Sequence, residues 1–289
     1  MRPKFQWRLR SRRLDLGART QVMGVLNVTP DSFSDGGQFL DPGRAVERAL
    51  QMLDEGADLL DLGGESTRPG SAERVSQEVE LRRVMPVVEG ILRQRPLAIV
   101  SVDTYKSQVA RAAIAAGAEI INDISAFRWD PEMAPAVAEL GCGAILMHMR
   151  GRPEEWRTLP PLDNLMGRVL RDLAHWAQDA LDHGVAHENL VLDPGFGFGK
   201  NFEENYPLVA RFEELHRMGF PLLAGVSRKS FLGRTLARGG KDAPPQDRLF
   251  GSLAAMTACI LRGAHLVRVH DVKPAVDAAR VADAILNAS

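Results

Sequence analysis

The sequence has little cysteine, no long apolar run and almost no net charge, and each shortage excludes a class of protein. Its only cysteines, Cys142 and Cys259, are isolated in apolar stretches. This is typical of reduced core thiols in a cytoplasmic protein and not of a disulfide or a zinc site. No run of about 18 apolar residues occurs, so no membrane-spanning helix is predicted. The formal net charge of −1 gives no strong field that would attract nucleic acid or an anionic membrane.

The charge is uneven only at the start of the chain. The first 13 residues contain six Lys or Arg and no acidic residue. No apolar stretch of the signal-peptide type follows, so no secretory signal is predicted. We expect this segment to form a solvated basic edge, or a short extra strand or hairpin.

A glycine-alanine pair precedes four short apolar runs, and at least three of these pairs follow a stretch of helical periodicity. "GADLLDL" begins at Gly56, "GAEIIND" at Gly117, "GAILMHM" at Gly143 and "GAHLVRV" at Gly263. Glycine adopts the left-handed conformation that ends many helices, and a strand can follow at once. The recurring junction therefore indicates a helix-then-strand unit that is used several times.

Extending this pattern along the chain predicts eight strands that alternate with eight helices. The strands are expected near residues 22–27, 58–62, 98–103, 119–123, 144–148, 189–193, 222–226 and 266–270. The helices are expected near residues 42–55, 76–94, 105–116, 131–140, 163–183, 203–218, 247–262 and 274–287. Alternating elements with nearly continuous apolar strands indicate a parallel sheet that is covered on both faces.

Eight such units in 289 residues favour an α/β fold of the (β/α)8 TIM-barrel type. The alternative, a doubly wound open sheet, is disfavoured because no glycine-rich dinucleotide fingerprint follows the first strand. No internal linker stands out, so residues 1–289 are expected to form a single domain. The Gly- and Pro-rich segment at 238–247 is interpreted as a mobile loop between the seventh strand and its helix.

Polar side chains stand at the ends of the predicted strands more often than turns require. Taken alone, each has an ordinary explanation as a turn former, a helix cap or a buried histidine. In a barrel, however, these ends meet at one rim, where active sites lie. Acceptors after the third, fourth and sixth strands would then face cations after the seventh and eighth. The residues concerned are Asn27, Asp103, Asn122, Asp193, Ser227, Lys229, Arg268 and His270.

The chemistry of this set suggests two halves of a binding site. Asp103, Asn122 and Asp193 offer acceptors to a ring that carries amino and N–H donors, and Lys229 suits a carbonyl or nitrogen of that ring.

The other half is cationic. Arg268 and His270, with Arg68 from the loop after the second strand, suit a phosphate or diphosphate. Asn27 offers a hard oxygen, which suits Mg²⁺ held mostly by water and a diphosphate. No Cys/His cluster indicates zinc, and no G-x-S-x-G motif is present.

Several motifs make the chain similar to a known family. "MGVLNVTPDSFSDGG" (23–37) and "DLGGESTRPG" (61–70) resemble the two signature loops of the dihydropteroate synthases of the folate pathway. "SVDTYK", "INDIS", "LDPGFGFGK", "GVSRKSFLG" and "RVHDV" continue the match in the family order. The resemblance covers roughly residues 20 to 275.

This resemblance implies a homodimeric (β/α)8 barrel that joins 6-hydroxymethyl-7,8-dihydropterin diphosphate to 4-aminobenzoate, giving 7,8-dihydropteroate and diphosphate. It also implies that sulfonamides compete with 4-aminobenzoate. Two loops would close over the site, one of them formed by residues 29–37, where Asp31 and Asp35 receive no role. The implied substrate-binding residues are Thr67, Arg68, Pro69, Asp103, Asn122, Met147, Asp193, Phe198, Ser227, Lys229, Arg268 and His270. Asp103, Lys229 and Arg268 would be catalytic, and Asn27 would bind Mg²⁺.

Two other functions remain open from the sequence. A pterin-dependent methyltransferase would share the ring acceptors, but it needs neither a diphosphate clamp nor the "TRPG" loop. A non-catalytic pterin-binding relative is supported only by "MHMRGRPEEW" and "PPLDNL", which depart from the family pattern after the fifth strand.

Overall fold

The computed structural model describes residues 2–29, 41–66, 74–156 and 158–288. Eight parallel strands lie in the order β8-β7-β6-β5-β4-β3-β10-β9, and a parallel bridge between Leu192 and Leu222 joins the two ends of the sheet. The expected (β/α)8 barrel is therefore confirmed. Its strands are β3 (Gln21–Asn27), β4 (Leu59–Gly63), β5 (Ile99–Asp103), β6 (Ile120–Asp123), β7 (Gly143–Met147), β8 (Leu190–Asp193), β9 (Leu223–Ala224) and β10 (Leu266–Val269).

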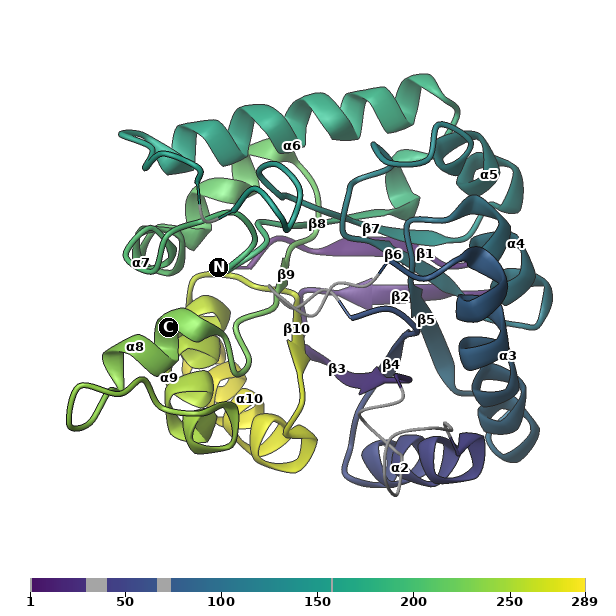
Figure 1. Cartoon of the computed structure of the whole chain (residues 1–289), viewed down its shortest axis with the longest axis horizontal. Coiled ribbons are helices and arrows are strands. Elements are labelled where there is room, and N and C mark those ends of the chain that lie inside the picture. Colours follow the sequence, from purple (N-terminus) through teal and green to yellow (C-terminus); the bar gives the residue numbers. More distant parts are fainter. Residues whose placement is uncertain (1, 30–40, 67–73, 157, 289) are drawn as a thin grey trace.

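Helices form an outer ring around these strands (Figure 1). Their apolar faces and the outward side chains of the strands make one large buried cluster between the two layers. The helices are α2 (Pro42–Asp54), α3 (Gln77–Gln94), α4 (Ser107–Ala115), α5 (Met133–Leu140), α6 (Leu165–Asp182), α7 (Asn205–Ala210), α8 (Ser230–Thr235), α9 (Leu249–Leu261) and α10 (Val272–Asn287). Within the described residues, no helix is long and apolar enough to cross a membrane.

The glycines that were expected to end helices do so at three of the four junctions. Gly56, Gly117 and Gly263 have φ values of 101°, 105° and 96°, which other residues rarely adopt. This agrees with the prediction that at least three would do so; at the fourth junction Gly141, with φ of 61°, follows α5. Gly143 is instead the first residue of β7.

Two predictions about the later helices needed correction. The helix expected over 203–218 is divided into α7 and a 3₁₀ helix over Phe212–Met218. Phe212 and Leu215 are fully buried, and their spacing of three places both on one edge of a 3₁₀ helix. The loop after β9 contains the unpredicted helix α8 and a 3₁₀ turn at Pro245–Arg248.

An N-terminal hairpin covers the end of the barrel where the strands begin, as the sequence suggested. Its strands are β1 (Phe5–Arg8) and β2 (Arg13–Leu16), which pair antiparallel. Trp7 is fully buried, and its indole N–H donates to the carbonyl of Asn189 at 2.7 Å. The hairpin and the lowest inward side chains of the strands form a separate apolar cluster. With this end filled, a ligand can enter the barrel only from the carboxyl ends of its strands.

Candidate active site

A hydrogen-bonded network crosses the interior of the barrel above the apolar layer. Arg268 on β10 donates from Nε to Asp61 Oδ2 at 2.6 Å and from Nη2 to Asp103 Oδ2 at 2.9 Å. Asn122 Nδ2 donates to the same oxygen of Asp61 at 3.0 Å, and Ser101 Oγ donates to Asp61 Oδ1 at 2.7 Å. Because β3 and β4 lie between β10 and β5, these contacts span the interior. Three of the predicted residues are thus brought together.

Asp61 is the centre of this network, and sequence reasoning missed it. It lies within "DLLDL", which we interpreted only as an apolar strand. Alternation along β4 places Asp61 inside the barrel, while Leu60 and Leu62 pack in the outer core. An acidic residue in the middle of an apolar barrel strand is the signal that could have identified it.

The charges in the network alter each other's protonation. Burial raises the pKa of Asp103 to about 7, although the Arg268 guanidinium favours the ionised carboxylate. Burial also acts to lower the pKa of Arg268, but Asp61 and Asp103 outweigh it and leave that pKa raised. Arg268 is therefore a permanent cation, whereas Asp103 can change its protonation near neutral pH.

A second cluster follows β8 and β9. Asp193 Oδ1 accepts a hydrogen bond from the Gly195 amide at 2.7 Å. Lys229 Nζ lies 3.9 Å from the ring centroid of Phe198. Burial raises the pKa of Asp193, whereas burial and the nearby Arg268 lower the pKa of Lys229 to about 7. The structure thus places Asp193, Phe198 and Lys229 in one neighbourhood, where the buried Asp193 and the partly exposed Lys229 influence each other's pKa.

Ser227 and His270 form a third pair. The Ser227 hydroxyl accepts from the main-chain N–H of His270 at 3.2 Å and lies 3.1 Å from Nδ1 of the same residue. Burial, together with the positive charge of Arg268, lowers the pKa of His270 to about 3. The imidazole is therefore neutral at neutral pH, with one N–H donor and one acceptor nitrogen, and Nδ1 can take either role toward the Ser227 hydroxyl. We had expected His270 to be cationic, but in this setting it offers a hydrogen-bond donor.

Apolar side chains line the mouth of the barrel beside these polar groups. Met147, Met149 and Ile124 are buried together, and Trp156 and Phe198 pack against them. The rings of Trp156 and Phe198 meet edge to face, with centroids 5.4 Å apart. Such a wall suits the flat face of an aromatic ring. Contact of Met147 and Phe198 with a substrate remains a prediction.

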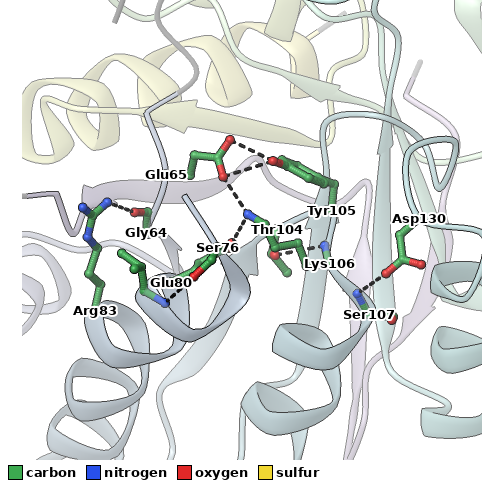
Figure 2. Close-up of polar contacts among 11 residues, drawn as sticks. Gly64, Glu65, Ser76, Glu80, Arg83, Thr104, Tyr105, Lys106, Ser107 and Asp130 are labelled. Atoms are coloured by element: carbon green, nitrogen blue, oxygen red, sulfur yellow. Dashed lines mark hydrogen bonds and ion pairs between the residues drawn. The ribbon is translucent and has the colours of Figure 1, made fainter. Parts of the chain in front are cut away.

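A charged cluster that the sequence did not predict lies where β4 and β5 end (Figure 2). Lys106 Nζ donates to Glu65 at 2.6 Å and to the buried Glu80 at 2.5 Å. Tyr105 also donates to Glu65, at 2.9 Å. Burial alone would lower the pKa of Lys106, but the two carboxylates leave it raised. Lys106 thus joins a residue after β4 to the first turn of α3.

Several predicted residues lie outside the described part of the chain. These are Thr67, Arg68 and Pro69, and residues 30–37 of the expected first loop, including Asp31 and Asp35. Asn27 is described: it ends β3 and pairs with Gly63, which pairs in turn with Asp103. No group of three or more His, Cys, Asp or Glu side chains within the described residues is arranged to hold a metal ion. A single amide oxygen at this rim suits Mg²⁺ that takes its other ligands from water and a phosphate group.

Comparison with known proteins adds independent findings. A family model described as "Pterin binding enzyme" matches residues 23–270. The dihydropteroate synthase of Escherichia coli K12 is 48% identical over 275 residues, which cover 95% of this chain and 94% of that protein.

Solved structures agree with the sequence match. The dihydropteroate synthase of Yersinia pestis in a sulfonamide drug complex is 45% identical, with a TM-score of 0.89 and coverage of 99% of this chain and 100% of that one. The enzyme of Xanthomonas albilineans with 4-aminobenzoic acid is 44% identical, with a TM-score of 0.89 and coverage of 98% of each chain.

Proposed function

The chain belongs to the dihydropteroate synthase family of pterin-binding enzymes, and from this membership we propose that it makes 7,8-dihydropteroate. It joins 6-hydroxymethyl-7,8-dihydropterin diphosphate to 4-aminobenzoate and releases diphosphate. The observation that carries the proposal is the bonding of Arg268 to Asp103 and Asp61 at the open end of the barrel, where Asp193 and Lys229 also lie close enough to shift each other's pKa. This places buried acceptors for a pterin ring next to cations for its diphosphate.

The pterin ring would be held by groups that point into the barrel. Asp193 and Asn122 accept from its amino and ring N–H groups, and Lys229 donates to its carbonyl or a ring nitrogen. The apolar wall that contains Met147 and Phe198 covers a ring face. The buried Asp193 carboxylate should discriminate strongly between ligands, because a ring without N–H donors would leave this carboxylate without a hydrogen-bond partner.

Asp103 would act on the charge that develops when the substrate reacts. The bond between the pterin methylene carbon and the diphosphate oxygen breaks, and the electron pair leaves with diphosphate. An ionised Asp103 stabilises the positive charge left on the methylene and ring. The amine nitrogen of 4-aminobenzoate then forms the new C–N bond and loses a proton to solvent.

The leaving diphosphate needs donors and positive charge. Arg268 provides both, and His270 provides a donor in the tautomer that carries its proton on Nε2. Asp61 holds the Nε side of Arg268, so a diphosphate can replace Asp103 at Nη2 without releasing the guanidinium. This exchange would free the Asp103 carboxylate to face the methylene.

Asn27 would hold Mg²⁺ together with the diphosphate. When bound, the ion supplies neutralising charge to the leaving group. Thr67, Arg68 and Pro69 are proposed contacts of 4-aminobenzoate, and Ser227 is proposed to lie near its carboxylate.

The experiment that tests the function measures diphosphate release by the purified full chain. Release is expected only when pterin diphosphate, 4-aminobenzoate and Mg²⁺ are all present, and 7,8-dihydropteroate should appear in equal amount. A folded protein that releases no diphosphate under these conditions would disprove the proposal. Growth of a strain that lacks dihydropteroate synthase, restored by this chain, gives the same answer in cells.

We further propose that residues 1–289 act as one pterin-binding domain, as a homodimer, in the cytoplasm. The unpaired, buried state of Cys142 and Cys259 supports a reducing compartment. Exposed apolar side chains on α9 and α10, including Phe250 and Val281, support self-association through these helices. The two helices lie side by side (Figure 1).

A further inference from the structure

Lys200 is a buried lysine whose described hydrogen bonds all go to main-chain oxygens, and burial lowers the pKa of its amine to about 7. In the sequence, Lys200 directly follows "DPGFGFG", and only 8% of its surface is exposed. Nζ donates to the carbonyls of Gly195 at 2.7 Å, Phe198 at 3.2 Å and His148 at 3.3 Å. An ammonium group has three N–H donors, so these contacts use all of them. One lysine thereby joins the loop after β8 to the chain just beyond β7.

The same loop is pressed against the chain after β7 at two other points. A Cβ on Gly195 would lie 1.9 Å from the carbonyl oxygen of His148, and one on Gly199 would lie 2.3 Å from that of Arg150. Both glycines have positive φ, at 67° and 65°. The loop therefore depends on close backbone contact, which the Lys200 hydrogen bonds maintain from the inside.

The loop presents two groups to the proposed pterin site. The Gly195 amide binds the Asp193 carboxylate, and the Phe198 ring lies against Lys229 Nζ. Positive charges on Lys229, Arg268 and Lys200 also favour the ionised form of Asp193. Any shift of residues 195–199 would move these contacts together.

We propose that Lys200 is a positioning residue for the pterin subsite: it holds residues 195–199 so that Phe198 and the Gly195 amide keep Lys229 and Asp193 in place. The proposal rests on the proposed function of the site. Lys200 itself does not touch the substrate, because its ammonium is enclosed by the three carbonyls. Its effect should therefore be specific to pterin binding.

The first test compares Lys200→Met with Lys273→Met. Methionine keeps an unbranched apolar stem but removes the donors and the charge. Lys273 is an exposed lysine on α10 that is paired only with Asp277 among the described contacts, so it controls for the substitution itself. For Lys200→Met, we expect the dissociation constant of pterin diphosphate, measured by calorimetry without the second substrate, to rise at least about tenfold. The Michaelis constant for the aminobenzoate substrate at saturating pterin diphosphate should change less than about twofold, and Lys273→Met should match the parent protein.

A second variant perturbs the loop without removing the lysine. Gly199→Ala introduces the clash with Arg150 and should reproduce the pattern of Lys200→Met: weaker pterin binding with an almost unchanged Michaelis constant for the aminobenzoate substrate. Lys200→Arg, which keeps charge and donors, should recover part of the pterin affinity.

A double-mutant cycle tests whether Lys200 acts through the loop. In a Lys229→Met background, Lys200→Met should weaken pterin binding less than it does in the parent protein, because one of the two groups that it positions is already lost. Fully additive effects would overturn the proposal. An unchanged dissociation constant in the folded fraction of Lys200→Met, with activity lost only in proportion to unfolding, would overturn it too. An inactive parent protein would instead count against the proposed function.

Discussion

Arg268 Nε lies 2.6 Å from Oδ2 of Asp61, a carboxylate with no exposed surface. Asp61 also accepts from Ser101 and Asn122, so one side chain fixes residues from β5, β6 and β10. Asp61→Asn keeps the shape but removes the charge that balances a buried guanidinium. We expect it to lower the free energy of unfolding by about 3 kcal/mol, measured in urea. A loss below about 0.5 kcal/mol would mean that Asp103 alone is a sufficient partner for Arg268.

Most of the barrel could be predicted because its strands and helices follow local rules. Asp41 accepts from the amide of Gly43 at the start of α2, and Gly56 ends the helix with positive φ, as its glycine-alanine junction predicted. The division of the helix expected over 203–218 could not be predicted in this way. It depends on burial of Phe212 and Leu215, which only the packed structure defines.

Site residues could be predicted where polar side chains end strands. They could not be predicted where the side chain lies within a strand or where its partners are main-chain atoms. Asp103, Asn122 and Arg268 were identified by their place at strand ends. Asp61 was missed because it lies inside an apolar strand. Lys200 was missed because its partners are carbonyl oxygens, which no sequence pattern identifies.

Asp103→Asn tests whether this carboxylate stabilises charge or only binds the ring. The amide retains one oxygen acceptor, so the dissociation constant of pterin diphosphate should rise less than about fivefold. Turnover should fall about 100- to 1000-fold, as when one group that stabilises developing charge is removed. The comparison requires single-turnover rates at saturating substrate. Equal losses in affinity and turnover would show that Asp103 contributes mainly to binding.

The pH dependence of kcat/KM should reveal the shifted groups. Catalysis needs Asp103 without its proton and Lys229 with it. Burial raises the pKa of Asp103 to about 7 and lowers that of Lys229 to about 7. Activity should thus be lost as the pH falls below about 7 and again as it rises above about 7, giving a narrow bell. Unshifted groups would give a plateau from about pH 4 to about pH 10.

Lys229→Arg tests whether Lys229 is the group whose loss of a proton lowers kcat/KM at alkaline pH. Arginine remains charged throughout the accessible range, so the loss of kcat/KM at alkaline pH should disappear, although the maximum is expected to be lower. The loss of kcat/KM at acid pH, which is assigned to Asp103, should occur at the same pH as in the parent protein. An unchanged alkaline side in Lys229→Arg would assign that titration to another group.

Trp7→Ala tests how much the N-terminal hairpin stabilises the barrel. The change leaves a cavity under the strands and removes the hydrogen bond to the Asn189 carbonyl. We expect the free energy of unfolding to fall by about 3 to 5 kcal/mol. Leu97→Ala is the matched control, because this side chain is 82% exposed and its loss should cost less than about 0.5 kcal/mol. A similar loss in the free energy of unfolding for both variants would mean that the hairpin does not stabilise the barrel core.

Phe250→Asp tests the proposed homodimer. Phe250 lies on α9 and is 81% exposed, which is unusual for a large aromatic side chain unless a partner covers it. An aspartate buried in the interface would lose its hydration without gaining a partner. The dimer dissociation constant, measured by sedimentation velocity, should therefore rise at least about 30-fold, the effect of losing a residue that contributes about 2 kcal/mol.

Leu97→Asp is the control for that experiment, since Leu97 is equally exposed but lies on the connection between α3 and β5, where its carbonyl accepts from Arg12 of the N-terminal hairpin. It should leave association unchanged. If Phe250→Asp associates as the parent protein does, the interface lies on another face. A parent protein that stays monomeric at micromolar concentration would exclude the homodimer. Because the proposed catalytic residues all come from one barrel, a monomeric Phe250→Asp variant should keep its turnover, and a loss of activity on dissociation would show that the partner subunit supports the site.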